Sequence, residues 1–192
     1  MTREPVRTLA ARYYTDQQVF ETERTGLFAR TWQFAGHASQ LAQAGDYFTF
    51  DLAGEGLFCI LGNDGKIRTF YNVCQHRAHE LLNGSGTTRV VVCPYHAWTY
   101  ELTGDVRAGH TIKSVAGLDR SAVCLTEVRT EHFLGFNFVN LDPSSPSMDN
   151  WFPNARAELE EWVPHFDSLV PLEWVEVPEN CNWKVSVENY SE

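Results

Sequence analysis

The chain has 192 residues, enough for one ordinary domain or for a small domain with part of another. Hydrophobic residues make up 43% and aromatic residues 13%, which indicates a globular chain with a packed core. The formal net charge of −10 and the lack of any basic run argue against nucleic acid or an anionic membrane as a partner. No apolar run can span a bilayer and no hydrophobic signal segment begins the chain, so we expect a cytoplasmic protein.

Residues 1–45 are predicted to form an N-terminal helical arm. Thr15 and Gln18 have the spacing of a capping box. Apolar residues then recur at helical spacing, and they predict an amphipathic helix over about residues 16–29. This helix carries no residue pattern that indicates chemistry.

Residues 46–141 have the period of β-strands rather than of helices. Apolar residues alternate from Asp46, a continuous apolar run covers 56–62, and a turn at Asn63-Asp64-Gly65 leads into a strand over 66–71. Further strands are expected at 89–92, 125–130 and 133–141. These segments predict an antiparallel β-sandwich of about seven to nine strands, in a chain of the α+β class.

The Pro- and Ser-rich run at 142–147 indicates the end of this small domain. Beyond it, a helical stripe (Trp151, Ala155, Leu159 and Trp162), a strand over 172–178 and a helix over 182–192 predict the start of an α/β domain, residues 142–192. The sequence stops without a helix cap or a polar tail. We therefore expect that the native polypeptide continues.

Two short motifs each combine one Cys with one His. The first is Cys74-Gln75-His76, and the second, after sixteen further residues, is Cys93-Pro94-Tyr95-His96. In a [2Fe–2S] cluster of the Rieske kind, two Cys hold one iron and two His hold the other. Both motifs follow predicted strands, so a rigid scaffold would present them on loops. We therefore expect Cys74 and Cys93 to bind one iron as thiolates, and His76 and His96 to bind the other.

A zinc site is the alternative interpretation of these four residues, because zinc takes the same ligand types in a tetrahedron. Structural zinc sites usually pair Cys with Cys and His with His at short spacing, whereas each motif here mixes the two types. This favours the iron–sulfur cluster. Cys59, Cys124 and Cys181 lack ligand spacing, and we interpret them as packing residues.

Four residues beside the motifs are candidates for supporting roles. His79 has ligand chemistry but lies three residues past His76, so we expect a hydrogen-bonding or interface residue. Arg77 directly follows a ligand, and an ion pair near the cluster and a solvated charge remain equal alternatives for it. Tyr95 and Trp98 are expected to pack around the cluster and to lower the local dielectric.

Longer stretches of the chain resemble the N-terminal part of the α subunit of Rieske non-haem iron oxygenases. The resemblance is carried by 72–82, by Cys93-Pro94-Tyr95-His96-Ala97-Trp98-Thr99-Tyr100 and by the closing 182–190. It implies a [2Fe–2S] cluster that takes electrons from an NAD(P)H-dependent reductase or a ferredoxin. It also implies a homotrimer, and a mononuclear Fe(II) that activates O₂ with ligands located beyond residue 192.

The same resemblance assigns a role to Glu192, as the carboxylate that bridges a cluster His of one subunit to an iron-ligand His of the next. Residues 78–82 and 93–98 are most similar to oxygenases acting on choline, glycine betaine, carnitine and stachydrine. We therefore expect hydroxylation or N-demethylation of a small quaternary ammonium compound. An aromatic-ring dioxygenase α subunit and a Rieske ferredoxin remain alternatives, although a ferredoxin would need little beyond residues 46–141.

Overall fold

The computed structural model describes residues 8–109, 112, 119–175 and 177–191. Three short helical segments come first: α1 (Arg12–Thr15), α2 (Gln17–Glu23) and the π-helical η1 (Arg24–Phe28). The strands are β1 (Gln33–His37), β2 (Asp46–Leu52), β3 (Glu55–Leu61), β4 (Ile67–Tyr71), β5 (Ser85–Thr87), β6 (Val91–Val92), β7 (Thr99–Tyr100), β8 (Val106–Ala108), β9 (Glu127–Phe133) and β10 (Phe136–Asn140). The other helices are η2 (Ala38–Gln40), η3 (Arg120–Val123), α3 (Met148–Trp151), α4 (Ala155–Trp162), η4 (Phe166–Ser168) and α5 (Trp183–Ser191).

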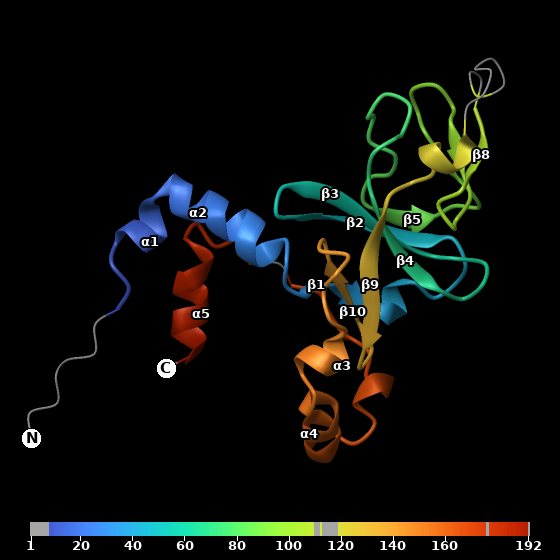
Figure 1. The fold of residues 1–192 in the computed structure, drawn as a ribbon. Coiled ribbons are helices and arrows are strands. Elements are labelled where there is room, and N and C mark those ends of the chain that lie inside the picture. The colour runs from blue at the N-terminus through green and yellow to red at the C-terminus, as the bar shows by residue number, and fades with distance from the viewer. Residues whose placement is uncertain (1–7, 110–111, 113–118, 176, 192) are drawn as a thin grey trace, which may run out of the picture.

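Two antiparallel sheets form the body of the molecule (Figure 1). The larger has seven strands in the order β1-β10-β9-β4-β3-β2-β5, and the smaller has three in the order β6-β7-β8. Ala53 and Gly54 join β2 to β3 with φ of 53° and 84°, the left-handed values of a tight hairpin turn. The fold therefore confirms the predicted antiparallel β-rich domain and the α+β class.

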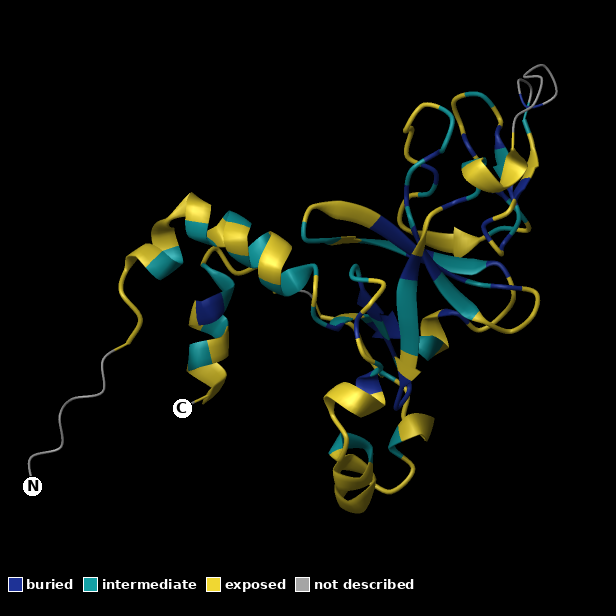
Figure 2. Ribbon diagram, viewed as in Figure 1, coloured by how far each residue is buried: buried dark blue, intermediate teal, exposed yellow. Residues whose placement is uncertain are grey.

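The main core lies between the two sheets, directly beneath the two Cys and His motifs. It is formed by apolar residues of β3, β4, the small sheet and the adjoining loops, among them Phe58, Ile60, Phe70, Tyr100 and Leu102. Figure 2 shows that buried residues are concentrated in the strands, whereas α4 and most of α5 are exposed. The site loops are thus supported by the best-packed part of the chain.

Strand β1 was not predicted, although it forms one edge of the large sheet. It pairs with β10, and the register shifts between Phe34 and Gly36. The hairpin turn between β9 and β10 also differs from expectation, because it falls at Leu134 and Gly135, both with positive φ. Division of the chain at residues 45 and 141 remains a prediction.

Three further expectations need correction. The helix cap is Asp16 rather than Thr15, because the Asp16 carboxylate accepts a hydrogen bond from the N–H of Gln18 at 2.8 Å. The apolar stripe of 151–162 is split between α3 and α4, with Pro153 in the gap between them. The described part of 172–178 contains no strand, and Leu172, Val175 and Val177 are exposed there.

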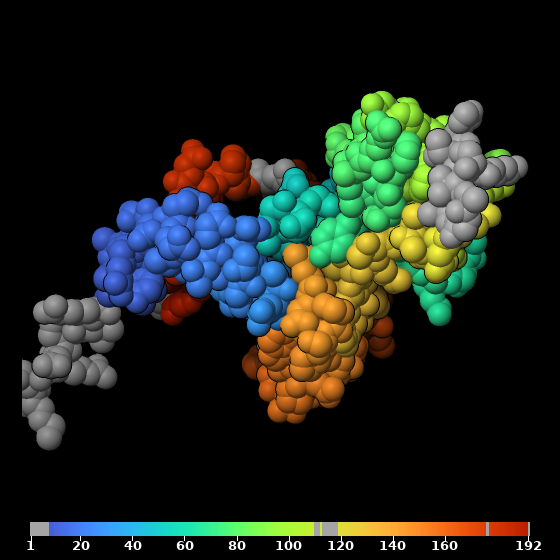
Figure 3. Space-filling view, turned by 45° about the horizontal axis from the view of Figure 1, so that its top comes forward, coloured from blue at the N-terminus to red at the C-terminus, as the bar shows by residue number. Residues whose placement is uncertain are grey.

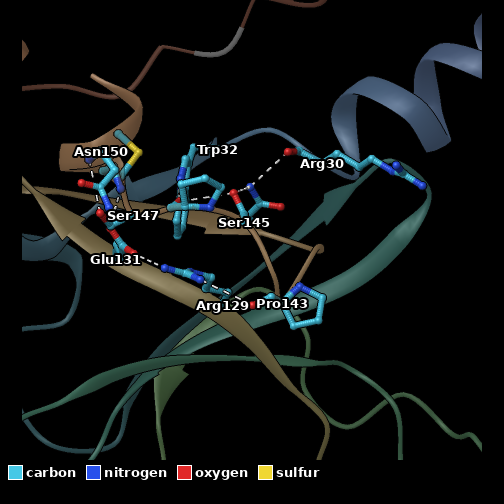
Figure 4. A network of polar contacts seen from close by, with 11 residues as sticks. Arg30, Trp32, Arg129, Glu131, Pro143, Ser145, Ser147 and Asn150 are labelled. Carbon is cyan, nitrogen blue, oxygen red and sulfur yellow. Dashed lines mark hydrogen bonds and ion pairs between the residues drawn. The ribbon is translucent and has the colours of Figure 1, made fainter. Parts of the chain in front are cut away.

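A polar network fastens the segment after β10 to the large sheet (Figure 4). Glu131 on β9 binds the Arg129 guanidinium at 2.9 Å and accepts a hydrogen bond from the N–H of Met148 at 2.8 Å. The Trp32 indole donates to the carbonyl of Pro146 at 2.9 Å. These contacts fix the path of the chain as it leaves the β domain.

Among the described residues, no helix has the length and apolar character that crossing a membrane requires.

Candidate metal centre

The first motif lies on a tight loop at the end of β4. The N–H of Cys74 donates to the carbonyl of His79 at 2.8 Å, and the N–H of Ala78 donates to the carbonyl of Cys74 at 2.9 Å. Ala78 has a φ of 53°, in the left-handed region. An isolated bridge between Val73 and Glu80 closes the base of the loop.

The second motif lies on a loop between β6 and β7 that repeats the same backbone geometry. The N–H of Cys93 donates to the carbonyl of Trp98 at 2.7 Å, and the N–H of Ala97 donates to the carbonyl of Cys93 at 3.0 Å. Ala97, like its counterpart in the first loop, has a left-handed φ, here 54°. The chain therefore builds the same small loop twice, with a Cys at the start of each.

The two loops bring like side chains together. Cys74 and Cys93 are both buried, with 2% and 3% of their surface exposed. Burial raises the pKa of the Cys74 thiol, and the adjacent Cys93 thiol raises it further. The imidazole rings of His76 and His96 face each other edge to face, with centroids 4.8 Å apart. Two thiols and two imidazoles thus form two pairs, as the sequence analysis expected.

The nitrogen atoms of these imidazoles have unused bonding capacity. Among the described residues, three buried side-chain polar atoms lack a hydrogen-bond partner, and two of them are Nδ1 of His76 and Nδ1 of His96. Buried polar atoms are normally paired, so an unpaired atom in a packed site indicates a missing ligand. A pair of metal-binding nitrogens opposite a pair of buried thiols fits a [2Fe–2S] cluster with mixed ligands.

Aromatic side chains enclose the pairs. Trp98 stacks on His76, with ring centroids 4.9 Å apart and planes 3° from parallel. Tyr95 lies against His96 at 3.7 Å between ring centroids, but 56% of its surface is exposed. Both residues pack beside the expected ligands, although only Trp98 is buried.

Tyr100 contacts the site, and the sequence analysis did not identify it as a candidate. It is fully buried, and its hydroxyl lies 3.3 Å from Sγ of Cys74. The N–H of Gln75 donates to the same hydroxyl at 3.1 Å, which leaves the Tyr100 proton available to the sulfur. The sequence did carry a signal for this role, because Tyr100 is an aromatic residue with a hydroxyl on the buried strand just after the second motif.

Two of the remaining candidates, His79 and Arg77, lie on the first loop beside the expected ligands. His79 is exposed, and its Nδ1 lies 2.6 Å from the carbonyl oxygen of Glu80. Arg77 is exposed. Glu192 falls outside the described residues. No group of three or more His, Cys, Asp or Glu side chains that could hold a single metal ion occurs in the described ranges.

The other three cysteines are free thiols with different surroundings. Cys59 is buried, and this burial raises the pKa of its thiol to about 12, as expected of a packing residue. Cys124 is half-buried. Cys181 is exposed, so its interpretation as a packing residue was wrong.

Comparison with known proteins agrees with this geometry. Residues 31–119 match the model of the Rieske [2Fe-2S] domain family. The carnitine monooxygenase oxygenase subunit of Escherichia coli (strain K12) is 39% identical over 186 residues, 96% of this chain and 50% of the relative. The glycine betaine monooxygenase oxygenase subunit of Chromohalobacter salexigens is 32% identical, over 94% of this chain and 40% of the relative.

A solved structure shows the same fold. It is that of a quaternary ammonium Rieske monooxygenase, described as giving insights into carnitine oxidation by gut microbiota and inter-subunit electron transfer. It superposes with a TM-score of 0.89 at 37% identity, over 94% of this chain and 50% of that one. The chain thus spans about half the length of the curated relatives it matches. With its paired Cys and His loops, the chain contains a Rieske [2Fe-2S] domain, and over nearly its whole length it is similar to the oxygenase subunits of Rieske monooxygenases.

Proposed function

We propose that this chain is the electron-receiving part of the oxygenase subunit of a Rieske monooxygenase or demethylase that acts on a small quaternary ammonium compound. The observation that carries the proposal is the facing pair of unpartnered imidazole nitrogens of His76 and His96 beside the buried thiols of Cys74 and Cys93. When bound there, a [2Fe–2S] cluster supplies one-electron redox chemistry.

The side chains of this chain hold that centre and control its environment. Cys74 and Cys93 would ligate as thiolates, and His76 and His96 through Nδ1. The stacked Trp98 keeps water from one face of His76. The Tyr100 hydroxyl, whose pKa is raised above its ordinary value by burial, stays protonated and donates toward Cys74. A hydrogen bond to a ligating sulfur stabilises the more negative, reduced state and so raises the reduction potential.

The relatives' names support the substrate class and the assembly. Proteins that act on carnitine and glycine betaine match over nearly the whole chain, and one related structure is associated with electron transfer between subunits. We infer a homotrimer in the cytoplasm, in which a reductase or ferredoxin supplies electrons and a mononuclear Fe(II) activates O₂. Glu192 is our candidate for the carboxylate that connects the two metal sites.

Many apolar side chains of the C-terminal third are exposed, and this supports a further domain that would cover them. Trp162, Leu172 and Tyr190 have 84%, 102% and 86% of their surface exposed. Isolated exposed apolar residues are ordinary, but a concentration of large ones marks an interaction surface. The catalytic domain that follows in an oxygenase subunit is our candidate for that cover.

The test of the cluster is spectroscopy of the protein reconstituted with iron and sulfide under anaerobic conditions. We expect a brown protein with two irons per chain and, after reduction, the paramagnetic resonance signal of a His-ligated [2Fe–2S] centre. The His96→Ala variant should lose the signal, while the matched control His79→Ala should keep it. A colourless protein with one zinc per chain, or equal loss in both variants, would refute the ligand assignment.

The substrate class needs a separate assay on the complete oxygenase subunit with its reductase. Carnitine or glycine betaine should stimulate NAD(P)H-dependent O₂ consumption with release of formaldehyde or a hydroxylated product. Turnover of an aromatic hydrocarbon instead would favour the ring-dioxygenase alternative. A cluster that cycles electrons with no substrate-dependent O₂ uptake would favour the ferredoxin alternative.

A further inference from the structure

We propose that Glu23 and Arg24 are positioning residues, which together brace helix α5 against the large sheet. They are neighbours in sequence, at the junction of α2 and η1, but their side chains reach opposite parts of the molecule. The inference deepens the proposed function and rests on it in one respect. It takes the segment that α5 leads into, beginning at Glu192, to be part of the electron path.

The first arm of the brace is an ion pair between Glu23 and Lys184. Nζ of Lys184 lies 2.6 and 2.7 Å from the two carboxylate oxygens of Glu23. The Trp183 indole also donates to Glu23, at 2.9 Å. Only 9% of the Lys184 side chain and 17% of the Glu23 side chain are exposed. Removal of one partner would leave the other charge desolvated and unpaired, so this pair is costly to break.

Two further contacts hold the same face of α5. The Tyr14 hydroxyl of α1 donates to Glu188 at 2.6 Å, and Glu188 lies one helical turn after Lys184. The rings of Phe28 and Trp183 meet edge to face at 5.2 Å. Figures 1 and 3 show α5 lying beside α1 and α2, which project from the body of the molecule.

The second arm joins η1 to the large sheet. Nη1 of Arg24 donates to the carbonyl of Ala53 at 2.9 Å, in the tight turn between β2 and β3. The same guanidinium is held by Glu21 through Nε at 2.8 Å. Adjacent residues of a helix point about 100° apart, so Glu23 can contact α5 while Arg24 contacts the large sheet.

The brace has a mechanical consequence because the covalent route from the sheet to α5 is long. Between β10 and α5 the chain runs through three short helices, α3, α4 and η4, and then through 169–182, where the described residues form no helix or strand. Without the brace, that route would leave the direction of α5 poorly defined. With it, the direction of α5 is set relative to the large sheet, whose strand β4 leads into the first cluster loop.

The test measures the distance between the sheet domain and α5 by pulsed electron paramagnetic resonance. Nitroxide labels are placed on the native Cys124 and on Cys181, two residues before α5; the other three cysteines are buried. The oxidised cluster is diamagnetic and does not disturb the labels. We expect one narrow distance distribution for the parent chain. We expect it to broaden at least about twofold in Glu23→Gln, Lys184→Met and Arg24→Met, because each leaves one arm without its partner.

Two controls define the outcome. Asp64→Asn breaks an ion pair with Arg68 in the turn between β3 and β4, away from α5, and should leave the distribution narrow. The charge-swapped double variant Glu23→Lys, Lys184→Glu should restore a narrow distribution. An unchanged distribution in Glu23→Gln or Arg24→Met, or a broad one in the parent chain, would overturn the brace. The cluster signal of the same samples is read independently. Absence of the cluster signal would refute the proposed function, whereas the distance distributions would still test the brace.

Discussion

The indole of Trp98 lies parallel to the imidazole of His76, with 4.9 Å between ring centroids and 3° between the planes. The two side chains come from different loops, so their contact ties the first motif to the second. Trp98 is 4% exposed and also belongs to the core between the sheets. It therefore links the packing of the domain to the orientation of one expected iron ligand.

Replacement of this indole should damage both stability and the site. We expect Trp98→Ala to lower the free energy of unfolding by about 3–5 kcal/mol, from lost burial and the cavity left behind. It should also admit water to His76 and speed the loss of cluster absorbance in air. Trp98→Phe, which keeps a flat ring, should lose less free energy of unfolding than Trp98→Ala and should lose cluster absorbance more slowly. Urea unfolding and the bleaching rate measure the two effects, and an alanine variant as stable as the parent would contradict the assignment.

The hydroxyl of Tyr100 should set the potential of the cluster. Its hydrogen bond toward Cys74 is worth about 1.4 kcal/mol more in the reduced state, so Tyr100→Phe should lower the midpoint potential by about 60 mV. Protein-film voltammetry measures that potential directly. Tyr95→Phe is the matched control, because Tyr95 is exposed, whereas Tyr100 is fully buried with its hydroxyl beside Sγ of Cys74. Equal shifts in both variants would argue against the hydrogen bond.

The sequence was informative where the determinants are local. The hairpin from β2 through β4 was predicted because apolar alternation and the Asn63-Asp64-Gly65 turn lie within one short stretch. The paired ligand motifs were recognisable for the same reason, since their spacing is short. Helix α5 was also expected, and its bounds, Trp183–Ser191, lie within the predicted range of 182–192.

The sequence was not informative where a distant partner decides the structure. β1 lacks β-branched residues, and it becomes a strand by pairing with β10, about a hundred residues later. The opposite error occurred at 172–178, where an apolar pattern suggested a strand but the described residues have no pairing partner. The contact of Tyr100 with Cys74 and the Glu23 and Lys184 ion pair likewise join segments whose proximity no local pattern reveals.

His37 should make the stability of the fold depend on pH. It is 5% exposed, and burial, followed by the charge of His132, lowers its pKa below the ordinary value. Its Nδ1 accepts a hydrogen bond from the N–H of Ser39 at 3.2 Å, which requires an unprotonated nitrogen. The unfolded chain therefore binds a proton more readily than the folded chain. The stability that neutral His37 contributes is fully present above about pH 6.5, the pKa of His in the unfolded chain. It declines as the pH falls below that value.

Urea unfolding at a series of pH values from 8 to about 5 tests this expectation. The parent chain should lose stability below about pH 6.5, and His37→Gln should lose less over the same range. His165→Asn is the control, because His165 is exposed and Asn tolerates the left-handed φ of 63° at that position. If both variants follow the parent curve, other groups cause the pH dependence.

Two glycines with similar backbone angles should respond differently to a methyl group. Gly104 and Gly65 have φ of 87° and 74°, so alanine at either position costs about 1–2 kcal/mol from backbone strain alone. A Cβ at Gly104 would lie 2.5 Å from a ring carbon of Phe70, which is 1% exposed in the core beneath the cluster loops. A Cβ at Gly65 would meet nothing within 4 Å. Overpacking of a core costs about a further 1–3 kcal/mol. Gly104→Ala should therefore reduce the free energy of unfolding by clearly more than Gly65→Ala in urea titrations. Equal losses would mean that Phe70 moves aside without cost, and that the core under the site is less tightly packed than its burial indicates.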